Sequence, residues 1–205
     1  MGPGAQPPAG PRFAGAGQGP GLPLTRIIAG AFRGRALRVP AGAATRPTAD
    51  RVRQALFDAL LHAPWGGRLD GLEVLDAFAG TGALGLEALS RGAAHASFLE
   101  RDRAALDAVR ANVAACGAGA RATVHPGDAL RPPPGRPCAL LFLDPPYGQD
   151  LLPRAAQALR AAGWAAPGAL LVGELGHAEA APALGTLLAE RRHGAARVCV
   201  WRLAP

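Results

Sequence analysis

The sequence contains no lysine, one methionine, one tyrosine and three cysteines. The cysteines, Cys116, Cys138 and Cys199, are far apart and odd in number, which fits neither a zinc-binding spacing nor a disulfide framework. We expect them to be small core residues in a reducing cytoplasm. No apolar run approaches the roughly 20 residues that a membrane span requires, and no apolar signal-peptide segment follows the first charges. These absences predict a cytoplasmic protein with no metal site and no contact with a membrane.

All of the excess positive charge lies in the first quarter of the chain. Residues 1–57 contain eight arginines and one acid, Asp50, a balance of +7 that equals the net charge of the whole chain. The other 148 residues contain fourteen arginines and fourteen acids and are therefore neutral. A one-sided basic segment is typical of contact with a polyanion such as a nucleic acid, although a solvated basic surface gives the same pattern.

Composition divides the chain into three parts. Residues 1–24 contain seven glycines, six prolines and one charge, which predicts a disordered tail. Residues 25–45 carry short apolar runs broken by arginines, which predicts a basic N-terminal β-hairpin extension. Residues 46–205 are long enough for one domain with its own core. We expect this domain to open with a helix that Thr48 caps, with Arg51 and Arg53 projecting from its first turns.

From residue 72 onward, strand patterns alternate with helix patterns. Helices are expected from the glycine turn to about Arg91, from Asp102 to Gly117, after a capping Asp150, and over residues 179–191. This alternation predicts a doubly wound, mostly parallel sheet. The expected strands cover residues 72–78, 96–100, 122–125, 138–143, 169–175 and 197–203.

Ligands of such sheets bind outside the carboxyl ends of the strands. The stretch after the first strand, Gly80-Thr81-Gly82-Ala83-Leu84-Gly85, matches the G-x-G-x-x-G pattern of nucleotide-binding turns, which by itself is a weak signal. Glu100 ends the second strand, where a carboxylate can accept hydrogen bonds from ribose hydroxyls. These two features suit NAD as well as other adenosine ligands.

Two further acids favour a ligand without phosphate. Asp76 ends the first strand, where it would repel a pyrophosphate but attract an amine or another cation. Asp128 follows the third strand, where it can accept a hydrogen bond from an adenine amino group. An adenosine joined to an amino acid matches these acids, and S-adenosylmethionine is such a ligand. Each acid alone is equally well explained as a helix cap or a solvated turn residue.

The fourth strand ends in Asp144-Pro145-Pro146-Tyr147, the (D/N/S)-P-P-(Y/F/W) signature of enzymes that methylate planar amino groups. Such an amine is weakly nucleophilic because its lone pair is delocalised into the ring. Asp144 and the carbonyl of Pro145 can accept its two N–H groups, and the prolines hold these acceptors rigid. Tyr147 can stack on the target base. Either Asp144 or water can take the proton.

Five stretches occur together in a family-specific order: RIIAGAFRGRALRVP, TRPTADRVRQALFDAL, LDAFAGTGALGLEALSRGA, FLERD and LLFLDPPY. Over residues 25–203 the chain resembles the bacterial small-subunit ribosomal RNA guanine-N2 methyltransferases, the RsmD family. The resemblance implies a Rossmann-like class I methyltransferase fold, a mostly parallel seven-stranded sheet with helices on both faces. It also implies methylation of one guanine N2 in 16S rRNA within the small ribosomal subunit or its assembly intermediate, with S-adenosylmethionine as cofactor. We expect a monomer.

The resemblance also implies roles for individual residues. The catalytic loop is Asp144, Pro145, Pro146 and Tyr147, where the family often has phenylalanine at the last position. Among the expected RNA-binding residues, Thr48 and Arg51 match the family's upstream helix motif, while Arg33, Arg35 and Arg46 are expected from the basic charge of the segment. The expected cofactor-binding residues are Asp76, Phe78, Ala79, Gly80, Thr81, Gly82, Glu100, Arg101, Asp128 and Ala129.

Three alternatives share parts of this pattern. A DNA adenine-N6 or cytosine-N4 methyltransferase uses the same DPPY chemistry, but it usually needs a target-recognition region for which these short linkers leave no room. A glutamine-amide methyltransferase gives no reason for the basic N-terminal segment. A non-catalytic RNA-binding module that holds S-adenosylmethionine would tolerate the loss of Asp144, whereas an enzyme would not.

Overall fold

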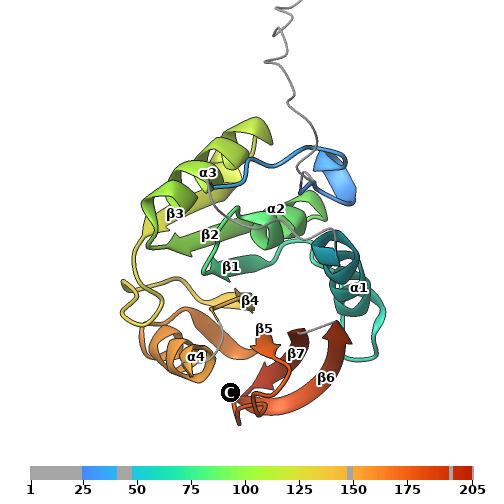
Figure 1. Cartoon of the computed structure of the whole chain (residues 1–205), viewed down its shortest axis with the longest axis vertical. Helices are drawn as coiled ribbons and strands as arrows, with labels where there is room; N and C mark the ends of the chain where they lie inside the picture. Colours follow the sequence, from blue (N-terminus) through green and yellow to red (C-terminus); the bar gives the residue numbers. More distant parts are fainter. Residues whose placement is uncertain (1–24, 41–47, 147–149, 194–195, 205) are drawn as a thin grey trace, which may run out of the picture.

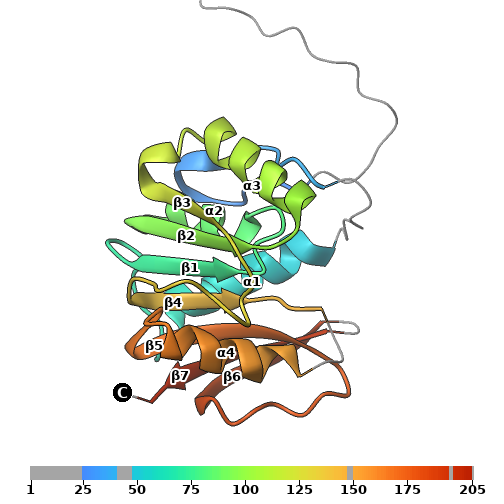
Figure 2. The same ribbon diagram turned by 90° about the vertical axis from the view of Figure 1, so that its left-hand side faces the viewer.

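The computed structural model describes residues 25–40, 48–146, 150–193 and 196–204. Their centre is a seven-stranded sheet in the order β3-β2-β1-β4-β5-β7-β6, and Figure 2 shows the strands stacked in this order. The four pairs from β3 to β5 are parallel, and the two pairs that involve β7 are antiparallel. The strands are β1 (Glu73–Ala77), β2 (His95–Glu100), β3 (Ala122–Pro126), β4 (Cys138–Leu143), β5 (Ala165–Gly176), β6 (Gly185–His193) and β7 (Ala196–Leu203).

Helices cover both faces of the sheet, as predicted. Helices α1 (Thr48–His62), α2 (Ala83–Ser90) and α3 (Arg103–Ala115) contribute to one apolar cluster. Helix α4 (Leu151–Ala161) contributes to the other, and Figure 1 shows α1 and α4 on opposite sides of the sheet. The central strand β4 is almost fully buried, as expected for a continuous apolar run in a parallel sheet.

The three cysteines lie in this core, as predicted, and all three are free thiols. Burial raises the pKa of the Cys138 thiol to about 12, so this thiol stays protonated near neutral pH.

One predicted helix is wrong. Within residues 179–191 the structure has the edge strand β6, which pairs antiparallel with β7 from Gly185 opposite Leu203 to His193 opposite Ala196. The stretch LLAER is rich in good helix formers, but pairing along β7 outweighs that local preference. Asp150 does stand at the N-cap of α4, but its side chain makes no capping hydrogen bond.

The described part of the basic N-terminal segment, residues 25–40, packs on the sheet domain as an irregular loop. From here on, the basic segment means these residues. Its backbone forms a single antiparallel bridge, Arg26 to Ala36, around the short 3₁₀ helix η1 (Gly30–Phe32), rather than the regular hairpin expected. Ile27 and Leu37 are fully buried in the same cluster as α1, α2 and α3. The segment is therefore part of the domain's core.

A second short 3₁₀ helix, η2 (Gly119–Arg121), leads into β3. Among the described residues, no helix combines the length and the apolar character that crossing a membrane requires.

Candidate functional site

The sheet brings the predicted acids to one edge. Asp76 pairs in register with Phe98 of β2 and Phe142 of β4, so Glu100 and Asp144 each lie two residues beyond its neighbours. Asp128 follows β3, which pairs with β2 up to Glu100. The carboxyl ends of four neighbouring strands thus hold one acid each, as the doubly wound pattern predicted.

The glycine turn after β1 is fastened to β2. The amides of Phe78 and Ala79 both donate to the carbonyl of Leu99, at 3.0 and 3.3 Å. Phe78 has φ +64°, which is rare for a bulky residue and marks a constrained backbone at the site. This strained residue starts the turn that the sequence assigned to the cofactor.

Packing explains why two of the turn's glycines are needed. A Cβ on Gly82 would lie 2.5 Å from Val109, and one on Gly85 would lie 2.4 Å from Phe98. At Gly80, by contrast, the nearest atom to an added Cβ is a carbonyl oxygen 3.9 Å away. The inner glycines therefore let α2 approach β2 and α3, while the turn stays open at Gly80.

Asp76 is almost fully buried, with 2% of its surface exposed. Burial raises its pKa to about 8; a hydrogen bond from the Gly85 amide at 2.9 Å opposes this rise, and the charges of Asp144 and Glu100 add to it. Near neutral pH the carboxyl is therefore mostly protonated, and a nearby cation would favour its ionised form.

Glu100 organises the next loop. One carboxylate oxygen accepts from the amides of Arg101 and Asp102 at 2.8 Å, and the other accepts from Gly80 at 2.9 Å. A carboxylate offers about four acceptor sites, so these bonds leave one for a ligand hydroxyl. Glu100 thereby joins the glycine turn to the N-terminus of α3, where Asp102 caps the helix by accepting from Ala105.

Asp128 follows β3, the neighbouring strand to the one that Glu100 ends. Asp128 accepts from the amide of Leu130 at 2.9 Å, and its other oxygen is 3.6 Å from the Arg101 guanidinium, which is largely exposed. Ala129 beside it is buried. This edge is acidic, with Arg101 as a cation at its rim.

The three carboxyl groups fit S-adenosylmethionine. Asp76, Glu100 and Asp128 suit a ligand that bears cationic groups, hydroxyls and an amino group, and they disfavour a pyrophosphate. The open backbone at Gly80 leaves room for close approach.

The DPPY stretch follows β4 directly. Pro145 is buried, Asp144 and Pro146 are exposed, and Tyr147 lies outside the described residues. The last pair between β4 and β5 is Leu143 with Gly173, and Asp144 and Glu174 each follow that pair by one residue. Glu174 and the two prolines also line a hollow of about 160 Å³ together with the start of α4.

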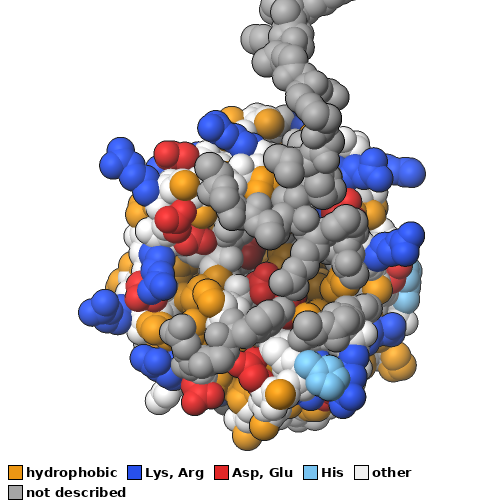
Figure 3. Space-filling model, viewed as in Figure 1, with side chains coloured by type: hydrophobic (Ala, Val, Ile, Leu, Met, Phe, Trp, Pro, Cys, Tyr) orange, Lys and Arg blue, Asp and Glu red, His pale blue; other side chains and the backbone are white. Residues whose placement is uncertain are grey.

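Of the predicted RNA-binding residues, Arg33, Arg35 and Arg51 are exposed. Arg33 and Arg51 line a second hollow, separate from the one beside Pro145 and Pro146, and Arg26 lines it with them. Thr48 begins α1, and Arg46 lies outside the described residues. Figure 3 shows arginine side chains around the rim of one face, with acidic side chains both among them and nearer its middle.

Arg53 is not one of the projecting arginines that the sequence suggested. It is 6% exposed, and its guanidinium donates to the carbonyl of Arg26 at 2.6 Å and to Asp50 at 2.8 Å. It therefore fixes the basic segment against α1.

Three buried polar residues that sequence reasoning missed hold the basic segment in place. Glu87 accepts from the amides of Ile28 and Ala29, at 2.8 and 3.1 Å. Ser90 accepts from Phe32 at 2.9 Å. Asn112 exchanges two hydrogen bonds with the backbone of Arg38 and donates a third to the carbonyl of Thr81 in the glycine turn.

The sequence does contain a hint of Glu87 and Asn112, because each is a polar residue within an apolar stretch of a helix. Glu87 interrupts ALGLEAL, and Asn112 stands beside Val113 on the inward face of α3. A buried polar side chain needs a partner, and here the partner is the backbone of the basic segment.

Comparison with known proteins places this architecture among methyltransferases. The family model described as "Conserved hypothetical protein 95" matches residues 25–202. "Ribosomal RNA small subunit methyltransferase D" of Escherichia coli K12 is 41% identical over 162 residues, which cover 78% of this chain and 76% of that protein. The protein of the same name from Haemophilus influenzae is 38% identical over 151 residues, 71% of this chain and 76% of that protein.

Solved structures show the same fold. A hypothetical protein of Thermus thermophilus superposes with a TM-score of 0.69 at 34% identity, covering 88% of this chain and all of that one. An RNA methyltransferase from Salinibacter ruber, solved with S-adenosyl-L-homocysteine, has a TM-score of 0.56 at 17% identity, covering 78% of this chain and 94% of that one. At that identity the second likeness is evidence for the fold alone.

Proposed function

We propose that this chain, which belongs to the conserved hypothetical protein 95 family, the RsmD family, methylates the exocyclic N2 amine of one guanine in 16S rRNA. The substrate is the small ribosomal subunit or an intermediate in its assembly, and S-adenosylmethionine is the methyl donor. Curated relatives with the name of a small-subunit ribosomal RNA methyltransferase support the class of substrate.

The observation that carries the proposal is the DPP stretch at the end of β4, beside the acid that ends β1. Asp144 is close enough to Asp76 to raise its pKa. The acceptor for a substrate amine and the acidic edge for a cationic cofactor therefore lie side by side.

The chemistry follows from these residues. S-adenosylmethionine supplies an electrophilic methyl group on a positively charged sulfur. Asp144 and the Pro145 carbonyl accept the two N–H groups of the guanine amine, and the nitrogen lone pair then faces the methyl carbon. The N–C bond forms as the C–S bond breaks, and one amine proton leaves to Asp144 or to water. Because the nitrogen gains positive charge during attack, both acceptors bind the transition state more strongly than the ground state.

The acids at the carboxyl ends of the strands bind the cofactor in this proposal. Glu100 offers its remaining acceptor site to a ribose hydroxyl, and Asp128 offers one to the adenine amino group. Asp76 stabilises the cationic methionine end. The turn residues from Phe78 to Gly82, together with Arg101 and Ala129, form the surrounding wall.

Residues in the first quarter of the chain, together with Tyr147, bind the RNA in this proposal. Arg33, Arg35 and Arg51, with Arg46 and Thr48, contact the rRNA backbone, and Tyr147 stacks on the target base. The rigid attachment of the segment by Glu87, Ser90 and Asn112 supports this assignment, because a fixed basic surface can orient RNA over the site. The enzyme acts as a cytoplasmic monomer.

Labelled S-adenosylmethionine tests the proposal. The protein is incubated with separate pools of small subunits, naked 16S rRNA and DNA, each from cells that lack the enzyme. Label is expected in the small subunits or the 16S rRNA. Label in DNA alone would instead support a DNA amino-methyltransferase.

A further inference from the structure

Two carboxylates lie near the point where β4 ends. Leu143, the last residue of β4, pairs with Gly173, so Asp144 follows this pair by one residue beyond β4 and Glu174 follows it by one residue within β5. The side chains alternate along each strand, and Phe142 and Val172 belong to the cluster on the α1 side of the sheet. Glu174, two residues after Val172 within β5, therefore faces this side, while Asp144 lies just beyond the end of β4 and is followed by Pro145.

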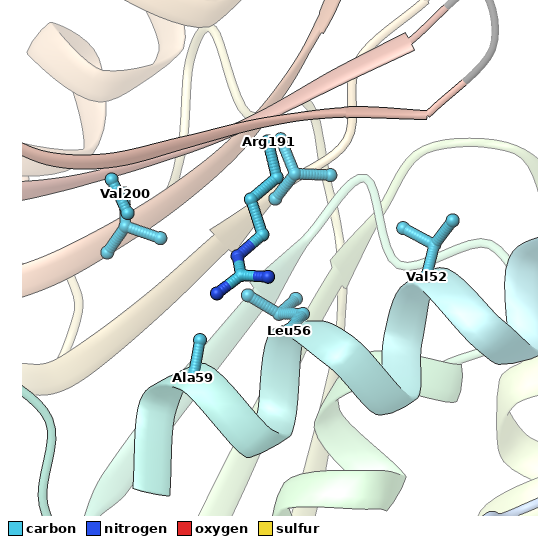
Figure 4. A pocket seen from close by; sticks show the side chains of 7 residues that line it. Val52, Leu56, Ala59, Arg191 and Val200 are labelled. Carbon is cyan, nitrogen blue, oxygen red and sulfur yellow. The ribbon is translucent and has the colours of Figure 1, made fainter. Parts of the chain in front are cut away.

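Glu174 is held firmly, unlike a residue on a loop. It lies inside β5 and pairs with Val198 of β7, which in turn pairs with Arg191 of β6. Figure 4 shows Arg191 reaching from the sheet across a groove toward Leu56 of α1, on this same side. Glu174 is half-buried and also lines the hollow that contains Pro145 and Pro146. Its position relative to the acceptor loop is thus set by the sheet.

The bases that carry exocyclic amines differ beside the amine. In guanine the N2 amine lies next to the ring N1–H, a second donor. In adenine and cytosine the amine lies next to a ring nitrogen that only accepts. A carboxylate next to the amine acceptor can bond to guanine, but it would face a lone pair in the other two bases.

We infer that Glu174 determines the specificity of this site for guanine by accepting a hydrogen bond from the ring N1–H while Asp144 and Pro145 hold the N2 amine. The inference rests on the proposed function and deepens it. The DPP stretch alone accepts any planar amine, and Glu174 on the neighbouring strand adds the discrimination that this stretch lacks.

The test uses the mapped target nucleotide and the variant Glu174→Gln. The methylated guanine is first located with labelled cofactor, and 16S rRNA is then prepared with guanine or 2-aminopurine at that position. 2-Aminopurine keeps the amine but has an acceptor at N1, to which a glutamine amide can donate. We expect the wild type to prefer guanine by at least about 10-fold in kcat/KM, and Glu174→Gln to narrow this preference by about 10-fold.

Glu179→Gln is the matched control. Glu179 lines the same hollow but accepts from the Gly176 amide, so its substitution should leave the preference unchanged. Both variants should bind S-adenosylhomocysteine within about twofold of the wild type, which excludes general damage to the fold.

Each outcome decides a separate point. A preference that is unchanged in Glu174→Gln, or shifted equally in Glu179→Gln, would overturn the role of Glu174 and leave the proposed function standing. Failure of the wild type to methylate the guanine RNA at all would overturn the proposed function itself.

Discussion

In the proposed reaction Asp144 accepts an N–H of the amine that is methylated, so its substitution should affect the chemical step directly. We predict that Asp144→Ala lowers methyl transfer by at least about 100-fold while the affinity for S-adenosylmethionine persists. Asp144→Asn keeps an acceptor oxygen and should fall between the alanine variant and the wild type. Single-turnover transfer of a labelled methyl group measures both.

The control for this prediction is Asp107→Ala. Asp107 lies on the exposed face of α3, paired with Arg110 at 3.7 Å, and its loss should not change turnover. Retained turnover in Asp144→Ala would remove Asp144 from its role and favour a non-catalytic binding module.

At Asp76 the prediction concerns pH. Burial raises the pKa of this carboxyl from about 3.8 to about 8, and a bound cation would favour the charged form. Cofactor binding should therefore release a proton below pH 8, and affinity should rise with pH and level off above that value. Calorimetry in buffers of different ionisation enthalpy measures the released proton. Asp76→Asn should abolish the pH dependence, and an unchanged dependence would contradict the assignment.

The raised pKa of Asp76 also makes the stability of the fold depend on pH. The folded state holds the Asp76 proton more tightly than the unfolded state, so this residue's contribution to folding is fully present below pH 3.8. That contribution is lost progressively as the pH rises toward 8. A bound cofactor should offset the loss, because its positive charge stabilises the carboxylate.

Among the elements, the attachment of the basic segment to α2 depends most on one side chain. Glu87 is fully buried and accepts from Arg91 at 2.8 Å as well as from two amides of the segment. We predict that Glu87→Ala lowers the free energy of unfolding by about 3–5 kcal/mol, because it removes the buried carboxylate that pairs with Arg91 and leaves two amides of the segment without their acceptor. Urea denaturation measures this, and Asp107→Ala should cost less than about 1 kcal/mol. Equal losses in the two variants would contradict the role of Glu87.

The exposed arginines of the segment should act on binding instead. Replacing Arg33 and Arg35 by alanine should weaken RNA binding and reduce its salt slope by about 1.5, since each phosphate contact contributes about 0.7–0.9. Arg103→Ala with Arg110→Ala on α3 is the charge-matched control. Binding isotherms at several salt concentrations distinguish the two pairs, and equal slopes would show that the segment is merely a solvated surface.

The elements that could be predicted were those with strong periodicity. The run CALLFL gave the bounds of β4 because a strand buried on both faces has a continuous apolar sequence. The edge strand β6 was missed because it is largely exposed and its residues favour helices, so only the pairing with β7 decides its conformation. The irregular shape of the basic segment depends on Glu87 and Asn112, which lie far away in sequence.

For the whole molecule, the sequence predicted which acids share an edge because parallel strands carry their carboxyl ends together. It did not predict that burial would raise the pKa of Asp76 to about 8. Nor did it predict that Glu100 would accept hydrogen bonds from three backbone amides. These features depend on packing around the turn. Glu174 lies inside β5, and only the register of β5 against β4 brings it close to Asp144.

The proposed product of this molecule is 16S rRNA that carries a methyl group on one guanine amine. The most direct test is to incubate small subunits from cells lacking the enzyme with the protein and labelled S-adenosylmethionine, digest the rRNA to nucleosides and identify the labelled one by mass spectrometry. The prediction is N2-methylguanosine from 16S rRNA, absent when Asp144→Ala replaces the wild type. Label in N6-methyladenosine or N4-methylcytidine, or no label at all, would contradict the claim.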